Sequence, residues 1–350
     1  WAGRLHAEVM DYLVAVDADV LCLQEVSRTP AARADWLTYR EPGLDLPQRA
    51  NFFDEVAAAL PSHDGIFAPT ATGPLYDGDT QLVAQFGLAT FVRKTLPVTA
   101  QAVDFVHGRF TPDGWGDHPR ARNAHVLRLL DAAGAPVTIA QMHGLRDSSG
   151  KGDIPARAAQ AEALVAFSSD LQEELGTDEA FLIGDFNAYT QEDPSVVIME
   201  AGYVDQGSKT DQYSYSFSGQ SGSLDHVYAS EAADAKVTGV DIWNINAGES
   251  IAKEDSRYNY NATDFYDESV YRSSDHDPVV VGYSAEALPV ELSLLDINDF
   301  HGRIDGNTVK FAGTIEQLRA EYGEDNPAFV SSGDNVGASL FASSSQQDQP

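Results

Sequence analysis

Residues 180–187 read Ala-Phe-Leu-Ile-Gly-Asp-Phe-Asn, and the interpretation of the whole sequence begins from this stretch. The apolar run that ends at Gly184 is typical of a buried strand, and Asp185 and Asn187 follow where that strand meets a loop. Loops at strand ends, held by a rigid sheet, are the usual position of catalytic groups. The stretch therefore predicts a core strand that presents a carboxylate and an amide at one edge of its sheet.

Four other short motifs place acidic residues or histidines directly after apolar runs of the same kind. They are Gln24-Glu25, Met142-His143-Gly144, Leu224-Asp225-His226 and Ser274-Asp275-His276-Asp277-Pro278. Taken singly, each has an ordinary structural explanation, such as a helix cap, a solvated strand end or an Asp-x-Asn turn. Their joint occurrence, each after a strand-like run, indicates one shared site that handles metal ions and protons.

The spacing of apolar residues predicts the elements that carry these motifs. Helices are expected over 5–16, 52–60 and 157–175. Strands are expected over 20–23, 86–93, 98–106, 124–130, 136–142, 180–184, 224–229, 237–243 and 278–283, with a hairpin over 124–142. Residues 28–50 are expected to be irregular, and the Gly-, Thr- and Asp-rich segment 70–82 to be a loop. Helices that flank strands of mixed direction indicate the α/β or α+β class, built as a layered sandwich.

The charge of the chain is its most unusual bulk property, with 54 acidic against 22 basic residues and a net charge of −32. A protein that holds DNA by neutralising phosphates carries a basic face, so this charge argues against tight, processive binding of duplex DNA. It does not exclude phosphodiester chemistry, because bound cations reverse a local acidic field. An acid-rich, lysine-poor surface also suits high salt, so we hypothesise a salt-adapted or marine source. Greater stability and activity at low ionic strength would contradict that hypothesis.

The single cysteine, Cys22, lies in an apolar run and is predicted to be a small buried hydrophobe. No apolar run reaches the roughly 18 residues of a membrane span. The first residues have neither the basic start nor the apolar stretch of a signal peptide. Because the sequence begins without methionine and stops abruptly, both ends are expected to be cut from a longer protein.

At its motifs the sequence resembles the endonuclease/exonuclease/phosphatase superfamily, also described as deoxyribonuclease I-like. Gln24-Glu25 is similar to the first metal motif of that superfamily, and residues 184–187 and 274–278 are similar to its two strongest signatures. The resemblance covers roughly residues 1–284, and residues 184–283 are similar to secreted bacterial nucleases. It implies a four-layered α/β/β/α sandwich with two mixed sheets, phosphodiester hydrolysis that depends on a divalent metal, and an extracellular or cell-surface location.

The resemblance also implies roles for individual residues. Glu25 would be the principal metal ligand, and Asp275 would support the metal side or the adjacent histidine. Asp185 would orient or deprotonate the attacking water, with Asn187 hydrogen-bonded to the phosphate. His276 would be a charged histidine that stabilises the phosphoryl oxygens or acts as general acid. Asp225 would orient His276 and keep it charged.

His143 is similar to the other phosphate-facing histidine of the superfamily. Arg122 would supply a further cationic contact to the phosphate, although Arg120 and Arg128 compete for that role. The expected ion is Mg²⁺ or Mn²⁺, because hard cations prefer oxygen ligands, and Ca²⁺ is a candidate structural ion. The superfamily pattern has one more residue, an asparagine on a strand before the first helix. This chain starts after that strand, so the first domain is expected to lack it.

Two features near these motifs have both a structural and a functional interpretation. His226 follows Asp225 directly, and a structural role is favoured for it over a catalytic one. The alternation Tyr213-Ser214-Tyr215-Ser216-Phe217 offers aromatic rings on which bases could stack. The same alternation is what a half-buried strand shows, and the strand is the favoured interpretation.

A second domain is expected to begin after a linker at 285–289. Residues 290–350 contain a predicted strand at 290–295, a helix at 314–322 and a strand at 328–331. Asp299, His301 and Asp334 resemble the opening of a 5′-nucleotidase-type metallophosphoesterase, in which they would ligate a two-metal centre. The later ligands of that family do not occur in 290–350, so this truncated α/β domain is expected to be catalytically incomplete.

Three functions are weighed. The first is an extracellular nuclease that degrades DNA or RNA and feeds nucleotides to the tethered nucleotidase. The second is a phosphatase or phospholipid diesterase of the same superfamily, acting on inositol phosphates or sphingomyelin. The third is a non-catalytic binding module, which the presence of every expected acid and histidine after the first strand disfavours. The expected partner is a nucleic acid or nucleotide, and no protein partner is implied. The sequence does not decide whether the substrate is DNA or RNA, whether cleavage is endo- or exonucleolytic, or which metal is used.

Overall fold

The computed structural model divides into two compact units, residues 1–287 and 288–350, at a point within the predicted linker. The structure describes residues 7–29, 38–40, 47–49, 51–77, 80–96, 125–130, 134–145, 154–217, 219–250, 253, 270–284, 293–298, 307–322 and 327–333. The predicted strand at 98–106 lies outside these ranges. Within the described residues, no helix is both long and apolar enough to cross a membrane.

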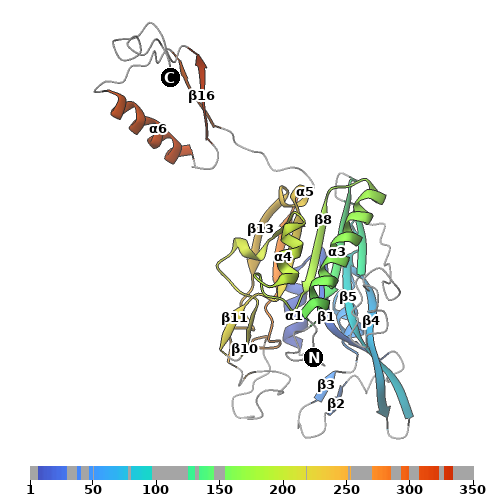
Figure 1. The fold of residues 1–350 in the computed structure, drawn as a ribbon. Helices are drawn as coiled ribbons and strands as arrows, with labels where there is room; N and C mark the ends of the chain where they lie inside the picture. The colour runs from blue at the N-terminus through green and yellow to red at the C-terminus, as the bar shows by residue number, and fades with distance from the viewer. Residues whose placement is uncertain are drawn as a thin grey trace. The chain divides into compact units, whose positions relative to one another are not determined.

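The strands of the first unit form two main sheets (Figure 1). The smaller sheet has the order β1-β5-β4, with β1 at Val20–Arg28, β4 at His63–Asp77 and β5 at Thr80–Arg93. The larger sheet has the order β6-β7-β8-β12-β9, formed by His125–Leu130, Pro136–His143, Ala180–Asp185, Asp225–Ser230 and Tyr203–Asp205 respectively. Three antiparallel pairs complete the unit: β2 (Thr38–Arg40) with β3 (Pro47–Arg49), β10 (Tyr215–Phe217) with β11 (Gln220–Gly222), and β13 (Val237–Ile242) with β14 (Val279–Tyr283).

Three hydrophobic clusters hold the sheets and helices together. The helices α3 (Ile154–Leu175) and α4 (Asp193–Glu200) pack on one face of the larger sheet, through residues that include Leu164, Leu182 and Ile198 (Figure 1). The second cluster joins the facing sides of the two sheets, with Val92, Ile139 and Phe181 among its members. The third packs α1 (Ala7–Val16) and α2 (Phe52–Ala59) against the smaller sheet through Leu13, Val56 and Phe91. The chain therefore has the mixed α/β fold that its pattern predicted.

Strand β8 lies in the middle of the larger sheet and fixes its register. It runs parallel to β7 and antiparallel to β12, so that Asp185 has His143 as its partner on one side and Asp225 on the other. Gly184, one residue earlier, has a φ of +150°. A Cβ atom at Gly184 would lie 1.8 Å from the carbonyl oxygen of Met142, so only glycine fits between the strands here.

The expectation that residues 70–82 form a loop is wrong. Most of this segment belongs to β4 and β5, which pair antiparallel from Ala71↔Phe86 to Asp77↔Thr80. Glycine, threonine and aspartate are common in turns, but the backbone hydrogen bonds of a long ribbon do not depend on these side chains. The pairing register shifts between Pro69 and Ala71, at the residue that lacks an N–H for the ladder. Residues 38–40 and 47–49, expected to be irregular, form β2 and β3.

Two contacts between distant parts of the chain tie the first unit together. The buried Gln141 side chain on β7 donates to the carbonyl of Leu23 on β1 (2.8 Å) and accepts from the hydroxyl of Thr90 on β5 (2.7 Å). Gln141 therefore joins the two main sheets by hydrogen bonds inside an otherwise apolar interface. The ring of Tyr12 on α1 packs 4.5 Å from that of Trp243, which follows β13. The first helix is thus anchored by a residue more than two hundred positions later.

In the second unit, β15 (Ser293–Asn298) pairs parallel with β16 (Pro327–Gly333), and α6 (Thr308–Tyr322) lies between them in sequence. The order of strand, helix and strand agrees with the elements predicted for residues 290–350, although β15 begins and ends three residues later than predicted and α6 begins earlier. That these elements open a metallophosphoesterase domain stays a prediction. Parallel strands need a crossover of this kind, since a short turn cannot join them.

Replacing Gly184 with alanine tests the close approach of β8 to β7. We expect Gly184→Ala to lower the free energy of unfolding by about 3 kcal/mol or more, because the new methyl group overlaps a backbone carbonyl and the backbone has a positive φ. Urea unfolding followed by circular dichroism measures the change. The control is Gly134→Ala, where φ is +85° but no atom lies within 4 Å of the new Cβ. Equal losses in the two variants would show that the overlap contributes nothing.

Candidate active site

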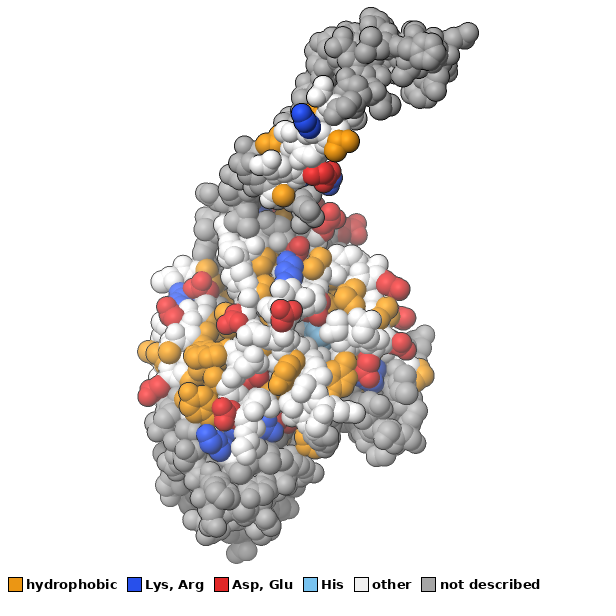
Figure 2. Space-filling model, turned by 90° about the vertical axis from the view of Figure 1, so that its left-hand side faces the viewer, with side chains coloured by type: hydrophobic (Ala, Val, Ile, Leu, Met, Phe, Trp, Pro, Cys, Tyr) orange, Lys and Arg blue, Asp and Glu red, His pale blue; other side chains and the backbone are white. Residues whose placement is uncertain are grey.

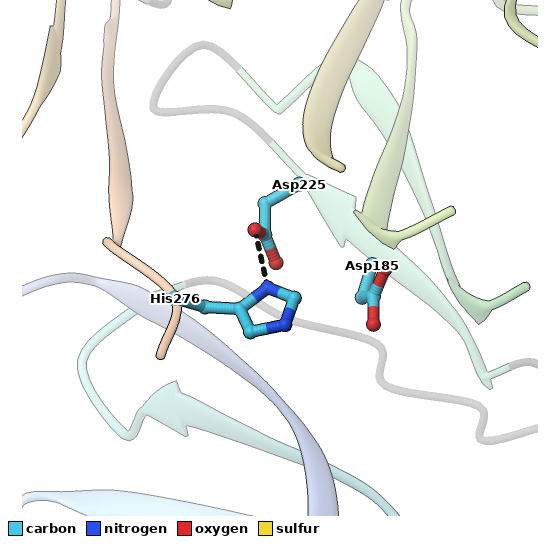
Figure 3. Close-up of side chains that lie close together, drawn as sticks. All are labelled: Asp185, Asp225 and His276. Atoms are coloured by element: carbon cyan, nitrogen blue, oxygen red, sulfur yellow. Dashed lines mark hydrogen bonds and ion pairs between the residues drawn. The ribbon is translucent and has the colours of Figure 1, made fainter. Parts of the chain in front are cut away.

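Three predicted residues lie in a row because they end, or begin, neighbouring strands at the same level. His143 is the last residue of β7, Asp185 the last of β8 and Asp225 the first of β12. His276, from the segment before β14, joins them, and Figure 3 shows its ring between the carboxylates of Asp185 and Asp225. One ligand atom from each of Asp185, Asp225 and His276 lies within 4.8 Å of the other two. The fold thus assembles residues far apart in sequence at one edge of the larger sheet.

Asp225 and His276 form the closest ion pair of the site. The Nδ1 atom of His276 lies 2.7 Å from Oδ2 of Asp225 (Figure 3). Burial by itself lowers the pKa of His276, but the carboxylates of Asp225, Asp185 and Asp275 overcome this and raise it to about 10. His276 is therefore an imidazolium at neutral pH. Its second nitrogen, Nε2, faces Asp185 and lies 3.9 Å from Oδ1 of Asp275. Such a group can donate a hydrogen bond or a proton to a phosphate oxygen.

Ser214, which the sequence did not single out, holds Asp225 in place. The buried hydroxyl of Ser214 donates to Oδ2 of Asp225 (2.8 Å), the same oxygen that His276 contacts. It also accepts from the backbone N–H groups of Leu224 and Asp225, at 3.3 and 3.1 Å. The carbonyl of Ser214 accepts from the N–H of Asp277, one residue after His276. Ser214 therefore fixes both the carboxylate and the segment that carries the histidine.

Asp185 is held as a carboxylate by hydrogen bonds from its own loop and from β7. Its Oδ1 accepts from the backbone N–H of Asn187 (2.7 Å), and its Oδ2 lies 3.2 Å from the Asn187 amide and 3.3 Å from Nε2 of His143. Burial by itself raises the pKa of Asp185, but contacts with His143, the charge of His276 and the Asn187 N–H lower it to about 2. A carboxylate with so low a pKa is a weak base, so this geometry favours orienting a water molecule over removing its proton.

The loop that carries Asn187 is braced by a buried arginine. Asn187 has a φ of 50°, which non-glycine residues adopt uncommonly, and its side chain also donates to the carbonyl of Gly144 (3.0 Å). Arg157 on α3 donates to the carbonyl of Asn187 and to Glu192. The same Glu192 oxygen accepts from the N–H of Tyr189 at 3.0 Å. These contacts keep the Asn187 amide beside Asp185.

Glu25 and Asp275, the predicted metal ligands in the first unit, lie next to this row. A register shift in the β1–β5 pairing between Leu23 and Val26 sets Gln24 and Glu25 in a bulge, and Glu25 has a φ of 55°. Its Oε1 lies 3.8 Å from Nε2 of His143. Burial raises the pKa of Asp275 above its usual range and the charge of Glu25 adds a smaller rise, whereas the charges of His276 and Arg272 lower it.

The donor set fits a hard divalent cation. Oδ1 of Asp275 is buried and has no hydrogen-bond partner among the residues that the structure describes. A buried carboxylate oxygen without a hydrogen-bond partner is costly unless a cation lies beside it, and Mg²⁺ and Mn²⁺ prefer such oxygens. The Nε2 atom of His276 lies 3.9 Å from this oxygen. The group Asp185, Asp225 and His276 is a second arrangement that could hold an ion, and its atoms already hydrogen-bond to one another or to Ser214 and Asn187. Glu25 and Asp275 stay the predicted metal ligands.

The remaining predicted site residues cannot be located. Arg122, Asp299, His301 and Asp334 all lie outside the described residues. The two-metal centre expected in the second unit and the arginine contact to the phosphate therefore stay predictions.

His226 is buried behind the site and is bonded on both nitrogens. Its Nδ1 lies 3.0 Å from Oδ2 of Asp205, and its Nε2 lies 2.9 Å from the carbonyl of Ala188. Burial lowers the pKa of His226, but the hydrogen bond and charge of Asp205 raise it overall. With both ring nitrogens donating, His226 is an imidazolium that ties the loop after Asn187 to the end of β9. This geometry supports the structural role favoured from sequence.

Most of the first unit matches a known protein family. The profile of the Endonuclease/Exonuclease/phosphatase family aligns with residues 3–276. The chain belongs to this family. Its members are hydrolases that act on phosphoester bonds of nucleic acids or other phosphate substrates with the help of a divalent metal. No match is found among curated protein sequences.

Solved structures that resemble the chain do so at low sequence identity. An endonuclease/exonuclease/phosphatase from Beutenbergia cavernae is 15% identical with a TM-score of 0.52, over 79% of this chain and 65% of that one. A mannosyl-6-phosphatase from Bacteroides thetaiotaomicron is 18% identical (TM-score 0.49; 78% and 88% covered), and the human Nocturnin catalytic domain with bound sulfate is 17% identical (TM-score 0.45; 67% and 74% covered). Likeness at this level concerns the fold alone and assigns no substrate.

Removing the charge of Asp205 tests the structural role of His226. We expect Asp205→Asn to lower the free energy of unfolding at neutral pH by about 3 kcal/mol, because it leaves a buried imidazolium uncompensated. Thermal and urea unfolding measure this loss. The control is Asp241→Asn on the exposed side of β13, for which we expect a change within about 0.5 kcal/mol. A loss no larger than in the control would show that His226 is neutral in the folded protein.

Deleting the hydroxyl of Ser214 tests its support of the Asp225–His276 pair. We expect Ser214→Ala to lower kcat for phosphoester hydrolysis about tenfold with little change in KM, since a hydrogen bond to a charged group is lost away from the substrate. Steady-state kinetics with a saturating divalent metal measure both constants. Ser216→Ala, whose hydroxyl contacts only the exposed Ser221 among the described residues, is the control and keeps its kcat. An unchanged kcat in Ser214→Ala would contradict the assigned role.

Proposed function

We propose that the chain is a metal-dependent phosphodiesterase that cleaves nucleic acid, and that it acts outside the cell. The observation that carries the proposal is the opposed pair of His276 and Asp185, whose ligand atoms lie within 4.8 Å. Beside this pair stand Glu25 and Asp275, the carboxylates suited to a cation. Phosphodiester hydrolysis needs a positioned water, neutralised phosphoryl oxygens and a stabilised leaving oxygen, and these four side chains together meet all three needs.

Each residue has a role that follows from its protonation and its contacts. Glu25 and Asp275 would hold the metal ion, which when bound withdraws electrons from the phosphate and neutralises its charge. Asp185, ionised and oriented by Asn187, accepts a hydrogen bond from the attacking water. His276 donates to the phosphoryl or leaving oxygen, and Asp225 keeps it charged and aligned. His143 lies beside both carboxylates, with its Nε2 3.3 Å from Oδ2 of Asp185 and 3.8 Å from Oε1 of Glu25.

Three broader parts of the proposal go beyond the site itself. The three hydrophobic clusters support a four-layered α/β/β/α sandwich for the first unit, with helices outside two stacked sheets. The similarity of residues 184–283 to secreted bacterial nucleases supports the extracellular nuclease. The motif residues Asp299, His301 and Asp334 support a coupled 5′-nucleotidase, which would convert released nucleotides to nucleosides and phosphate.

A substrate panel with metal removal tests the proposal. Purified protein is incubated with Mg²⁺ or Mn²⁺ and linear DNA, circular DNA, RNA, a phosphomonoester or sphingomyelin. We expect cleavage of nucleic acid, its loss on adding EDTA and its recovery on adding back the metal. Glu25→Ala and His276→Ala should each lower turnover by at least about a hundredfold without unfolding the protein.

The same panel separates the alternatives. Turnover of the phosphomonoester or of sphingomyelin, with every nucleic acid left intact, would replace the nuclease by a phosphatase or a phospholipid diesterase. Full activity in Glu25→Ala or His276→Ala would refute the assigned site. Cleavage of linear but not circular DNA would identify an exonuclease.

A further inference from the structure

A short hairpin carries two stacked aromatic rings from the active site to solvent. Strand β10 pairs with β11, and a further backbone bridge links Tyr215 to His276. The ring of Tyr215 lies 4.7 Å from the imidazole of His276. The ring of Phe217, two residues on and so on the same face of the strand, stacks on Tyr215 with centroids 6.3 Å apart and planes at 19°. The aromatic row thus starts at a predicted catalytic residue.

The outer ring of this row is partly exposed to solvent. Phe217 is 40% exposed, which is a high value for a large apolar side chain that stacks on a neighbour. Tyr215 is half-buried, and its pKa is raised to about 12 by burial and by the charges of Asp275, the Tyr189 phenol and Asp185. The ring of Tyr215 thus lies between His276 and Phe217, and Phe217 is the ring of this row that is exposed to solvent.

A third aromatic ring lies against the same hairpin. A Cβ atom on Gly222 of β11 would lie 2.6 Å from the ring of Tyr189, so that ring rests directly on the hairpin backbone. Tyr189 follows Asn187 closely, on the loop that Arg157 and Glu192 brace. The rings of Tyr189, Tyr215 and Phe217 therefore all lie on or against β10 and β11, and the ring of Tyr215 is in contact with that of His276.

The hairpin has no charge with which to bind phosphates. Residues 215–222 contain no lysine or arginine, and the other face of the hairpin carries Ser216 and Ser221, bonded to each other at 3.2 Å. Figure 2 views the side of the molecule where β10 and β11 lie in Figure 1, and its described surface shows many acidic and hydrophobic side chains but few basic ones. Binding here must come from ring contacts, not from phosphate neutralisation.

We propose that Tyr215 and Phe217 form a stacking subsite for an unpaired nucleobase next to the scissile phosphate, so that single-stranded nucleic acid is the preferred substrate. The inference rests on the proposed nuclease function. In a duplex the faces of the bases are already stacked on one another, whereas a single strand offers them freely. Stacking also tolerates the net charge of −32, which opposes the many phosphate contacts that duplex binding needs. The polar Ser216, Gln220 and Ser221 make the hairpin a poor wedge for a lipid surface.

The experiment compares three oligonucleotides of one length with Mg²⁺: a single strand, the same strand with abasic tetrahydrofuran residues throughout, and the duplex. For the unmodified protein we expect kcat/KM on the normal single strand to exceed that on the abasic strand by about tenfold or more, the effect of one base–aromatic stack. Phe217→Ala should remove most of this ratio by lowering kcat/KM on the normal single strand. Phe217→Trp should keep the ratio, and Phe217→Leu should lose it.

The control is Phe311→Ala on α6 of the second unit, the same substitution at a side chain of nearly equal exposure, 38% against 40%. It should retain the ratio, and thermal melting should show that every variant is folded. Equal hydrolysis of normal and abasic strands, a preference for the duplex, or a ratio kept by Phe217→Leu would overturn the stacking subsite but leave the nuclease intact. Cleavage of no oligonucleotide, with turnover of sphingomyelin vesicles that Phe217→Ala weakens, would overturn the proposed function and this inference together.

Discussion

The register around β8 is the constraint on which the site depends. Asp185 sits level with His143 on a parallel neighbour and with Asp225 on an antiparallel one. A slip of one residue in either pairing would send the side chains of that strand to the opposite face of the sheet. Gly184 protects the register, because the strands approach so closely there that no larger residue fits. The chemistry of the protein is thus set by backbone hydrogen bonds before any side chain is considered.

Buried polar residues hold the segments around His143, Asp185 and Asp225 in place. Gln141 joins the two sheets close to the bulge that turns out Glu25, and Ser214 shares one oxygen of Asp225 with His276. Arg157 holds the Asn187 loop. Buried hydrogen-bonded groups of this kind are costly to disrupt, since each lost partner leaves another group unsatisfied. They give the charged residues fixed positions with little freedom to rearrange.

The elements and motifs that local pattern determines were predictable from the sequence. The hairpin of β6 and β7, the buried strand β8 and the long helix α3 follow from runs of apolar residues, and the predicted site residues that the structure describes come together at one sheet edge. What escaped prediction depends on pairing across distance. Ser214 is one serine in an alternating polar and aromatic segment. Its role depends on contacts with Asp225 and the segment that carries His276, which are distant in sequence. The pairing of β4 with β5 over residues 70–82 was not predicted, because this segment is rich in residues that are common in turns.

The contact between Tyr12 and Trp243 can form only late in synthesis of the chain, because the two residues are far apart in sequence. The first helix cannot reach its final packing until a residue far downstream has been synthesised, and Glu25 likewise waits for residues near 275. Contacts of such high sequence separation form late and slowly. A partly synthesised chain therefore carries no assembled hydrolytic centre. For an enzyme whose substrate is as abundant inside its own cell as phosphate esters are, this delay would act as a built-in safeguard during translation.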